Sequence, residues 1–170
     1  MNNSILKTCS FTGHRPEAFP WKDNKEDDRM KCLLARLEKA IDTVIAEGVT
    51  HFICGNAKGV DTWAAEIVIE KKKAHPELFL EIALPFEGHN ASVPEVKAVC
   101  DAADLVHVVS DSDYYKSAYH ERNRYMVNNS RYLVAVYDDL SGSKSGTYKT
   151  LSYAQSKGKK VIQIPWMDIK

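Results

Sequence analysis

A histidine and an arginine, His14 and Arg15, come directly after a β-prone stretch near the start of the chain. Gly13, His14, Arg15 and Pro16 follow the run from Thr8 to Thr12. A guanidinium can bind a phosphate or a carboxylate through two parallel hydrogen bonds, and a histidine can donate to either anion. A surface turn with a structural arginine is the alternative interpretation. We favour anion binding, because loops held by a rigid scaffold carry many binding residues.

Two further loops have the composition of anion-binding turns. They are Gly55-Asn56-Ala57-Lys58-Gly59-Val60-Asp61 and Ser145-Gly146-Thr147. A glycine lets the backbone approach an anion, and a helix that begins just afterwards offers free N–H groups and the positive end of its dipole. Each loop alone is equally consistent with an ordinary strand-to-helix turn, in which Asp61 and Thr147 are polar residues of the first helical turn. Two such loops together favour a phosphate-bearing ligand.

A third segment is dense in hydrogen-bond donors and aromatic rings. It runs from Tyr119 to Tyr125 and includes Arg122, Asn123 and Arg124. On a helix, Arg122 and Tyr125 share one face while Arg124 points elsewhere. We therefore expect one of the two arginines to face the site and the other to pair with a carboxylate.

Other histidine, methionine and tryptophan side chains are interpreted as structural. Four histidines have no partner group nearby in the sequence, which favours structural or solvent-exposed roles. They are His51, His75, His89 and His107. Helical spacing predicts a second group of residues to lie in the core, namely Met30, Trp63 and Met126.

Apolar periodicity predicts the elements that position these residues. Strands are expected at 8–12, 51–54, 80–84, 105–109, 132–137 and 161–164, and helices at 30–45, 63–68, 94–103, 119–129 and 146–157. The strands form continuous apolar runs, which is typical of strands buried on both faces, and their alternation with helices indicates a parallel sheet. The predicted fold class is α/β, a single Rossmann-like three-layer sandwich with a mostly parallel sheet of about six strands. Residues 1–170 are expected to form one domain.

The three loops that could bind an anion follow the first, second and fifth of these strands. In an open parallel sheet, ligands bind beyond the carboxyl ends of the strands. All three loops are therefore expected at one edge of the sheet, and this coincidence is the main argument for a binding site there.

Composition limits the partners that the chain can have. Lysine plus arginine and aspartate plus glutamate both number 23, so the formal net charge of +0 makes nucleic acid an unlikely partner. The longest apolar runs, such as Tyr132 to Tyr137, are far shorter than the ~20 residues of a membrane helix. With no secretory signal at the start, we expect a cytoplasmic protein without a membrane partner.

Cysteine and histidine usage argues against a protein-held metal. The four cysteines form no CxxC pair and are predicted to be reduced core residues, while the six histidines are dispersed. A symmetric homodimer is the expected assembly, since twofold dimers are the commonest oligomers.

Three nucleotide and hydrolase signatures are missing. No GxGxxG follows the first strand, and the second strand ends in Gly55-Asn56 rather than in the acidic residue that holds an adenosine ribose, which disfavours a dehydrogenase that uses NAD. The chain also lacks the P-loop GxxxxGK[ST] and the GxSxG turn of the α/β-hydrolases.

Five motifs together resemble a known family. They are TGHRP at 12–16, GNAKGVD at 55–61, LPF at 84–86, RNRYMV at 122–127 and SGT at 145–147. In this order they are similar to the YpsA-like family of the SLOG superfamily, whose relatives include the DNA-processing protein DprA and the LOG cytokinin-activating hydrolases. The resemblance implies a Rossmann-like fold whose glycine loops bind a nucleotide or an ADP-ribose-like ligand in a bacterial or phage-type protein.

Two departures from the relatives narrow the function. Ser145 stands where the family usually has the first glycine of a GGT triplet, and Thr150 stands where the LOG hydrolases carry a glutamate. The second departure disfavours a LOG-type phosphoribohydrolase. Binding of single-stranded DNA in the manner of DprA would require a basic groove with stacking aromatics, which the net charge does not support.

The leading hypothesis is therefore a module that binds or senses a nucleotide-like small molecule. The predicted binding residues are Gly13, His14, Arg15, Gly55, Asn56, Ala57, Gly59, Asp61, Arg122, Asn123, Ser145, Gly146 and Thr147. One alternative is a hydrolase or transferase that acts on such a ligand, with Asp61, Glu121 or His14 as the acid/base group. The other alternative is single-stranded DNA binding.

Overall fold

A parallel sheet of six strands forms the centre of the computed structural model, which describes residues 3–170. The strands are β1 (Thr8–Gly13), β2 (His51–Gly55), β3 (Phe79–Leu84), β4 (Leu105–Val108), β5 (Tyr132–Val136) and β6 (Lys160–Ile164). The helices are α1 (Asn3–Leu6), α2 (Asp28–Ala46), α3 (Val60–Lys72), α4 (Pro94–Ala102), α5 (Tyr115–Asn128) and α6 (Gly146–Ser156). The fold is a Rossmann-like α/β sandwich, which confirms the predicted fold class.

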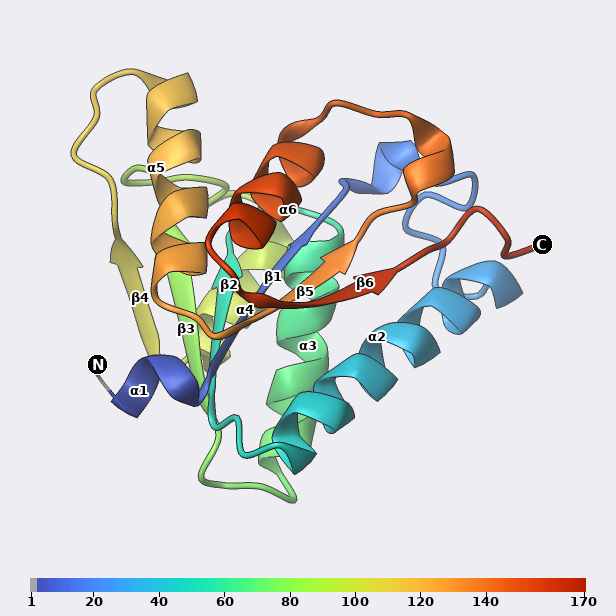
Figure 1. Ribbon diagram of the computed structural model, residues 1–170, viewed down its shortest axis with the longest axis horizontal. Coiled ribbons are helices and arrows are strands. Elements are labelled where there is room, and N and C mark those ends of the chain that lie inside the picture. Colours follow the sequence, from blue (N-terminus) through green and yellow to red (C-terminus); the bar gives the residue numbers. More distant parts are fainter. Residues whose placement is uncertain (1–2) are drawn as a thin grey trace.

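The order of the strands in the sheet is β4-β3-β2-β1-β5-β6, and every neighbouring pair is parallel. The chain moves outward from β1 to β4 and then crosses to the other side of β1 to form β5. Helices α2, α3 and α4 pack together on one face of the sheet, and α5 packs beside α6 on the other (Figure 1). The change of direction between β1 and β5 creates the crevice in which open α/β sheets bind ligands.

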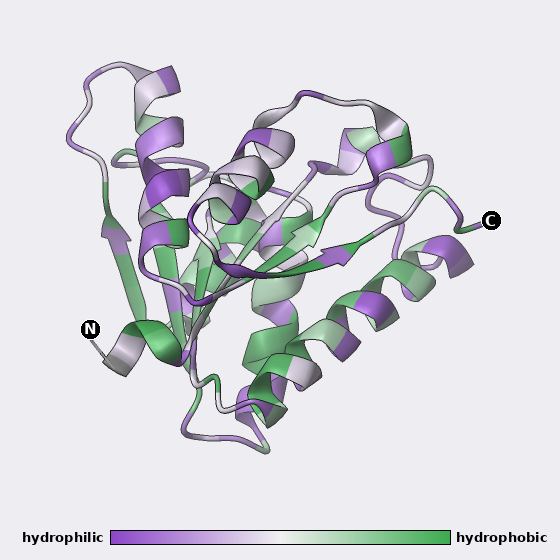
Figure 2. Ribbon diagram, viewed as in Figure 1, coloured by the Kyte–Doolittle hydropathy of each residue, from purple (hydrophilic) through white to green (hydrophobic). Residues whose placement is uncertain are grey.

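The core forms where the apolar stripe of each helix meets the sheet. Helix α2 begins at Asp27, whose side chain accepts a hydrogen bond from the Arg29 N–H and so caps the first turn. Its inner face buries Met30, Leu37 and Ile41. The central strands are correspondingly hydrophobic, whereas α5 is largely hydrophilic (Figure 2).

The residues that the sequence predicts to lie in the core differ in how deeply they are buried. Met30, Trp63 and Met126 are buried, as predicted. All four cysteines are free. Cys9 and Cys54 are fully buried and Cys100 packs half-buried against the core, so the prediction of core cysteines is wrong for Cys32. Among the described residues, no helix has both the length and the apolar character that a membrane crossing needs.

Strand β4 corrects the expectation that every strand is buried on both faces. Leu105, Val106 and Val108 are 37–39% exposed, because β4 is an edge strand of the sheet and pairs only with β3. Helix α5 also begins at Tyr115, one turn before the predicted start at Tyr119. Its polar sequence gives almost no apolar periodicity from which to predict that start.

A buried carboxylate links three strands and α5. Both oxygens of Glu81 in β3 accept hydrogen bonds, Oε1 from His51 Nε2 at 2.8 Å and Oε2 from His107 Nε2 at 2.8 Å and the Tyr125 hydroxyl at 2.6 Å. These bonds agree with the structural role predicted for His51 and His107, and their partner comes from a neighbouring strand rather than from nearby sequence. Burial raises the pKa of Glu81, but these hydrogen bonds outweigh it and lower the pKa to about 2.

We expect Glu81→Gln to lower the free energy of unfolding by about 2 to 3 kcal/mol at pH 7, since one pKa unit corresponds to about 1.4 kcal/mol. The folded pKa lies below the ordinary value of 4.5, so the contribution is complete above pH 4.5 and is lost as the pH falls toward 2. Urea unfolding of both proteins from pH 7 to pH 2 measures this effect. A stability difference that stays constant over that range would contradict it.

Candidate functional site

A cleft of about 460 Å³ lies at the carboxyl ends of β1 and β5, where the sheet changes direction. Its volume is within the range of small-molecule sites. The loop after β1, the start of α3, one face of α5 and the start of α6 all contribute to its walls. Most of the predicted binding residues line it, namely Gly13, His14, Arg15, Ala57, Asp61, Arg122, Asn123, Ser145, Gly146 and Thr147.

Three of the predicted residues, Gly55, Asn56 and Gly59, do not line the cleft. Gly55 ends β2 directly behind it. A Cβ on Gly55 would lie 2.5 Å from Asp61 Oδ2 and 2.8 Å from Arg122 Nη1. The missing side chain therefore allows a carboxylate and a guanidinium to approach the end of β2 together.

Gly59 joins two of the loops that form the cleft. It precedes the first residue of α3 with φ +87°, a backbone conformation that favours glycine, and an added Cβ would lie 2.5 Å from the carbonyl oxygen of His14. The N–H of Val60 donates to that same carbonyl at 3.2 Å. Gly59 thus fixes the start of α3 against the loop after β1.

Asn56 lies outside the cleft and forms hydrogen bonds with a neighbouring loop. Its Nδ2 donates to the His89 carbonyl at 2.7 Å, and its own carbonyl accepts from Asn90 Nδ2 at 2.7 Å. The thiol of Cys100 also contacts Asn56 Oδ1 at 3.1 Å. These bonds fasten the loop around His89 to the end of β2, so the structure places Asn56 as a support of the loop rather than in the cleft.

Arg122 is the buried cation of the cleft. Its side chain lies over the Tyr119 ring, with Cζ 5.7 Å from the ring centroid, and its Nε donates to Asn123 Oδ1 at 2.9 Å. Only 5% of the residue is exposed, and Nη1 has no hydrogen-bond partner within residues 3–170. Burial lowers the pKa of Arg122 and Asp61 opposes the shift, but a guanidinium remains charged at neutral pH.

Asp61 is the buried carboxylate that faces this cation. Its Oδ2 accepts from the Ala57 N–H at 3.3 Å. Burial raises the pKa of Asp61, while Arg122, the Ala57 N–H and Arg15 oppose the rise. The cleft therefore contains a carboxyl group that takes up a proton more readily than an ordinary aspartate does.

His14 and Arg15 line the cleft from the loop after β1. The imidazole of His14 packs among the rings of Phe19, Tyr137 and Trp166, and its Nε2 is buried without a partner in the described part of the chain. Burial lowers the pKa of His14, so the ring is neutral at pH 7. Arg15 is exposed at the mouth of the cleft.

The start of α6 completes the cleft. The hydroxyl of Ser145 caps this helix by accepting from the Tyr148 N–H. The N–H groups of Gly146 and Thr147 belong to the first turn, whose amides have no acceptor within the helix. This end of α6 therefore presents hydrogen-bond donors and the positive end of the helix dipole.

Two expectations for the helix segment need correction. Arg122 does face the site, but Arg124 stacks over the Tyr153 ring at 4.7 Å instead of pairing with a carboxylate. Glu121, one of the candidate acid/base groups, is exposed, accepts a hydrogen bond from the Ser110 hydroxyl, and does not line the cleft. Tyr119 lines the cleft and was not predicted, although its position one helical turn before Arg122 could have indicated it.

Comparison with known proteins identifies the family of the chain. Residues 9–169 match the family described as YspA SLOG (YpsA). A UPF0398 protein of Halalkalibacterium halodurans is 35% identical over 64% of this chain, a match that spans 61% of the relative's own length. The uncharacterized SPbeta prophage-derived protein YoqJ of Bacillus subtilis is 35% identical over 72% of this chain and 78% of its own length.

A more distant relative extends the match along the chain. A UPF0398 protein of Staphylococcus epidermidis is 23% identical over 86% of this chain and 81% of its own length. The family match itself runs from β1 to the residues that follow β6, so it includes every loop of the cleft. The chain belongs to the YspA SLOG family.

Proposed function

We propose that the cleft between β1 and β5 binds a nucleotide or a nucleotide-derived small molecule, with a phosphate group beside Arg122 and the start of α6. The observation that carries the proposal is the buried Nη1 of Arg122, which has no partner among the described residues. A buried cation that is not fully paired costs free energy, and an anion bound beside the guanidinium in the cleft lowers that cost. The first turn of α6 supplies further donors on the same side.

The shape and remaining groups of the cleft favour a nucleotide over a simple anion. Its volume of about 460 Å³ far exceeds that of one phosphate. Tyr119 and Met126 give part of the wall an apolar character, against which a base or a sugar packs in this proposal. Arg15 at the mouth adds a second cation on a different loop.

Calorimetric titration with ADP and ADP-ribose tests this proposal. Both probes are expected to bind, and Arg15→Ala is expected to weaken binding about tenfold, because a charge-assisted hydrogen bond contributes about 1.5 kcal/mol or more. Arg15 is exposed, so the variant keeps its fold. Lys73→Ala is the matched control, since it removes an exposed cation at the far end of α3. Equal binding by all three proteins would contradict the proposal.

Catalysis on the bound ligand is a second candidate function, and the raised pKa of Asp61 favours it. A carboxyl with a raised pKa inside a cleft can act as a general acid toward a glycosidic or phosphate leaving group. The titration mixtures are therefore also analysed for released base and phosphate. Release that is lost in Asp61→Asn supports an enzyme, whereas intact ligand after prolonged incubation supports a binding module.

A further inference from the structure

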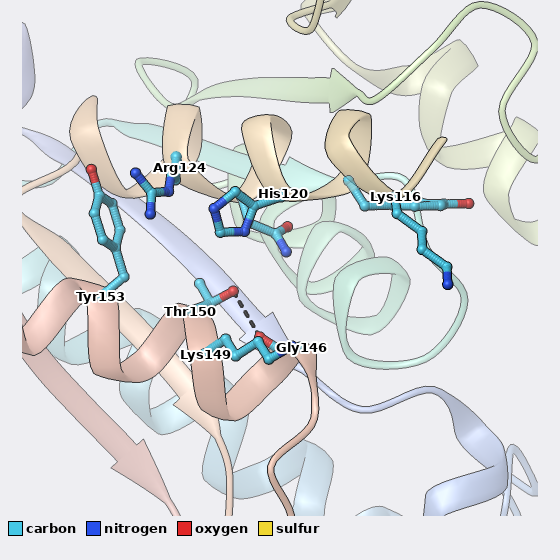
Figure 3. Close-up of a pocket in the computed structure, with 9 residues that line it drawn as sticks. Lys116, His120, Arg124, Gly146, Lys149, Thr150 and Tyr153 are labelled. Carbon is cyan, nitrogen blue, oxygen red and sulfur yellow. Dashed lines mark hydrogen bonds between the residues drawn. The ribbon is translucent and has the colours of Figure 1, made fainter. Parts of the chain in front are cut away.

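A second, smaller pocket lies between α5 and α6, next to the cleft. Its volume is about 180 Å³, and side chains from both helices project into it (Figure 3). Tyr119, Asn123 and Gly146 line the pocket and the cleft alike, so the two spaces adjoin. We call this pocket the α5–α6 groove. Any ligand that fills the cleft reaches the entrance of the groove.

Among the described residues, the lining of the groove includes two lysines, an arginine and a histidine, and no carboxylate. Lys116, His120 and Arg124 come from α5, and Lys149 comes from α6. The α5 residues are spaced by four, which aligns them in a stripe about 12 Å long on one side of the helix. The lining therefore has the character of an extended site for negative charge.

The two lysines and the arginine that line the groove form no ion pair with an acidic side chain of residues 3–170. At the end of α3, by contrast, Lys71, Lys72 and the C-cap residue Lys73 each contact a carboxylate. Within residues 3–170, neither Lys116 nor Lys149 has an acidic partner. The same holds for Arg124, whose guanidinium lies over the Tyr153 ring, 4.7 Å from its centroid. Several unpaired positive charges therefore line one groove, and this arrangement favours the binding of an anion there.

The volume of the groove limits which anion it can hold. A groove of about 180 Å³ is too small for a whole nucleotide, since sites for such molecules are about 300 Å³ or larger. It suits a single phosphate group. We infer that the natural ligand carries two separate phosphate groups, one beside Arg122 in the cleft and a second in the α5–α6 groove. This inference rests on the proposed function and narrows its ligand to nucleotides phosphorylated at two positions.

Two matched probes test the inference. They are 5′-AMP and adenosine 3′,5′-bisphosphate, which differ by one phosphate, titrated into the full chain at low and at moderate salt. The bisphosphate is expected to bind at least tenfold more tightly at low salt, with a smaller advantage at moderate salt because the groove cations are exposed. The double variant Arg124→Gln with Lys149→Gln is expected to remove this advantage while leaving 5′-AMP binding unchanged. Lys73→Gln, at the far end of α3, is the control and keeps the advantage.

The outcomes separate the inference from the proposed function. Binding of both probes with equal affinity overturns the inference and leaves the cleft as a nucleotide site. Binding of neither probe overturns both. Bisphosphate binding that depends on the groove residues but not on Arg15 identifies an independent anion site, which also contradicts a single ligand across both spaces. Tighter binding of a single-stranded oligonucleotide than of the bisphosphate assigns the groove to nucleic acid instead.

Discussion

Replacing Arg122 with methionine is expected to abolish ligand binding and to lower the free energy of unfolding by about 4 kcal/mol at pH 7. Methionine retains the length and packing of the side chain above Tyr119 but removes the charge. Binding is lost because the buried donor beside the proposed phosphate position is gone. Stability is lost because Asp61 keeps its buried carboxylate without the cation that faces it.

The pH dependence of this loss identifies its cause. The folded pKa of Asp61 is already above its ordinary value of 3.8, and it rises further when the attraction of Arg122 is removed. A carboxyl with a raised folded pKa stabilises the protein least at high pH, because folding then buries a charge. The stability deficit of the variant is therefore expected to be larger at pH 8 than at pH 5 in urea unfolding. Equal deficits at the two pH values would show that lost packing, rather than charge, is responsible.

A double variant separates binding from stability. Asp61→Asn together with Arg122→Met removes both buried charges, and we expect it to recover stability to within about 1 kcal/mol of the original chain. Binding of ADP-ribose is expected to remain absent, since no cation faces the phosphate position. Recovery of binding in the double variant would mean that Arg122 acts only by balancing Asp61.

The parts of the fold that could be predicted depend on local patterns. Each central strand is an apolar run bounded by a loop, and α2 has a continuous stripe of buried residues, so both were identifiable without knowing their neighbours. The cleft was predictable for the same reason. Parallel strands bring their carboxyl ends to one edge, so the loops containing His14, Asp61 and Thr147 had to meet there.

Features that depend on which strands are neighbours could not be predicted in the same way. The exposure of β4 follows from its place at the edge of the sheet, which the run Leu105 to Val108 does not reveal. The contacts of Glu81 require β2, β3 and β4 to lie side by side in a fixed register. A charged residue within the apolar segment of β3 was the available signal, because a buried carboxylate requires partners.

The buried, unpaired Nη1 of Arg122 could not be predicted from the sequence at all. The segment indicated that one arginine would face the site, but the depth of its burial is set by Tyr119, by Asn123 and by the absence of a side chain on Gly55. Those three residues come from two different elements. Their combined effect is a property of the packed structure and not of any motif.

Replacing Gly59 with alanine is expected to lower the free energy of unfolding by about 4 kcal/mol, the sum of an unfavourable backbone conformation and a steric clash. Its φ of +87° with ψ of −133° is a conformation that residues with a side chain avoid. In addition, the new Cβ would lie 2.5 Å from the His14 carbonyl oxygen and 2.9 Å from Arg15 Cα, and neither backbone atom can move without shifting the loop. In a domain of this size, such a loss lowers the melting temperature by roughly 10 °C.

Gly48→Ala is the matched control for this variant, because it isolates backbone conformation from steric clash. Gly48 has φ +102°, but no atom lies within 4 Å of the position of an added Cβ, so we expect a loss of only about 1 kcal/mol. Because Gly59 fixes the loop of Arg15 against the start of α3, Gly59→Ala is also expected to weaken ADP-ribose binding, whereas Gly48→Ala leaves it unchanged. Calorimetric unfolding and ligand titration of both variants measure the two effects. Similar losses at the two positions would show that the contact with His14 contributes nothing, and that the two loops adapt independently.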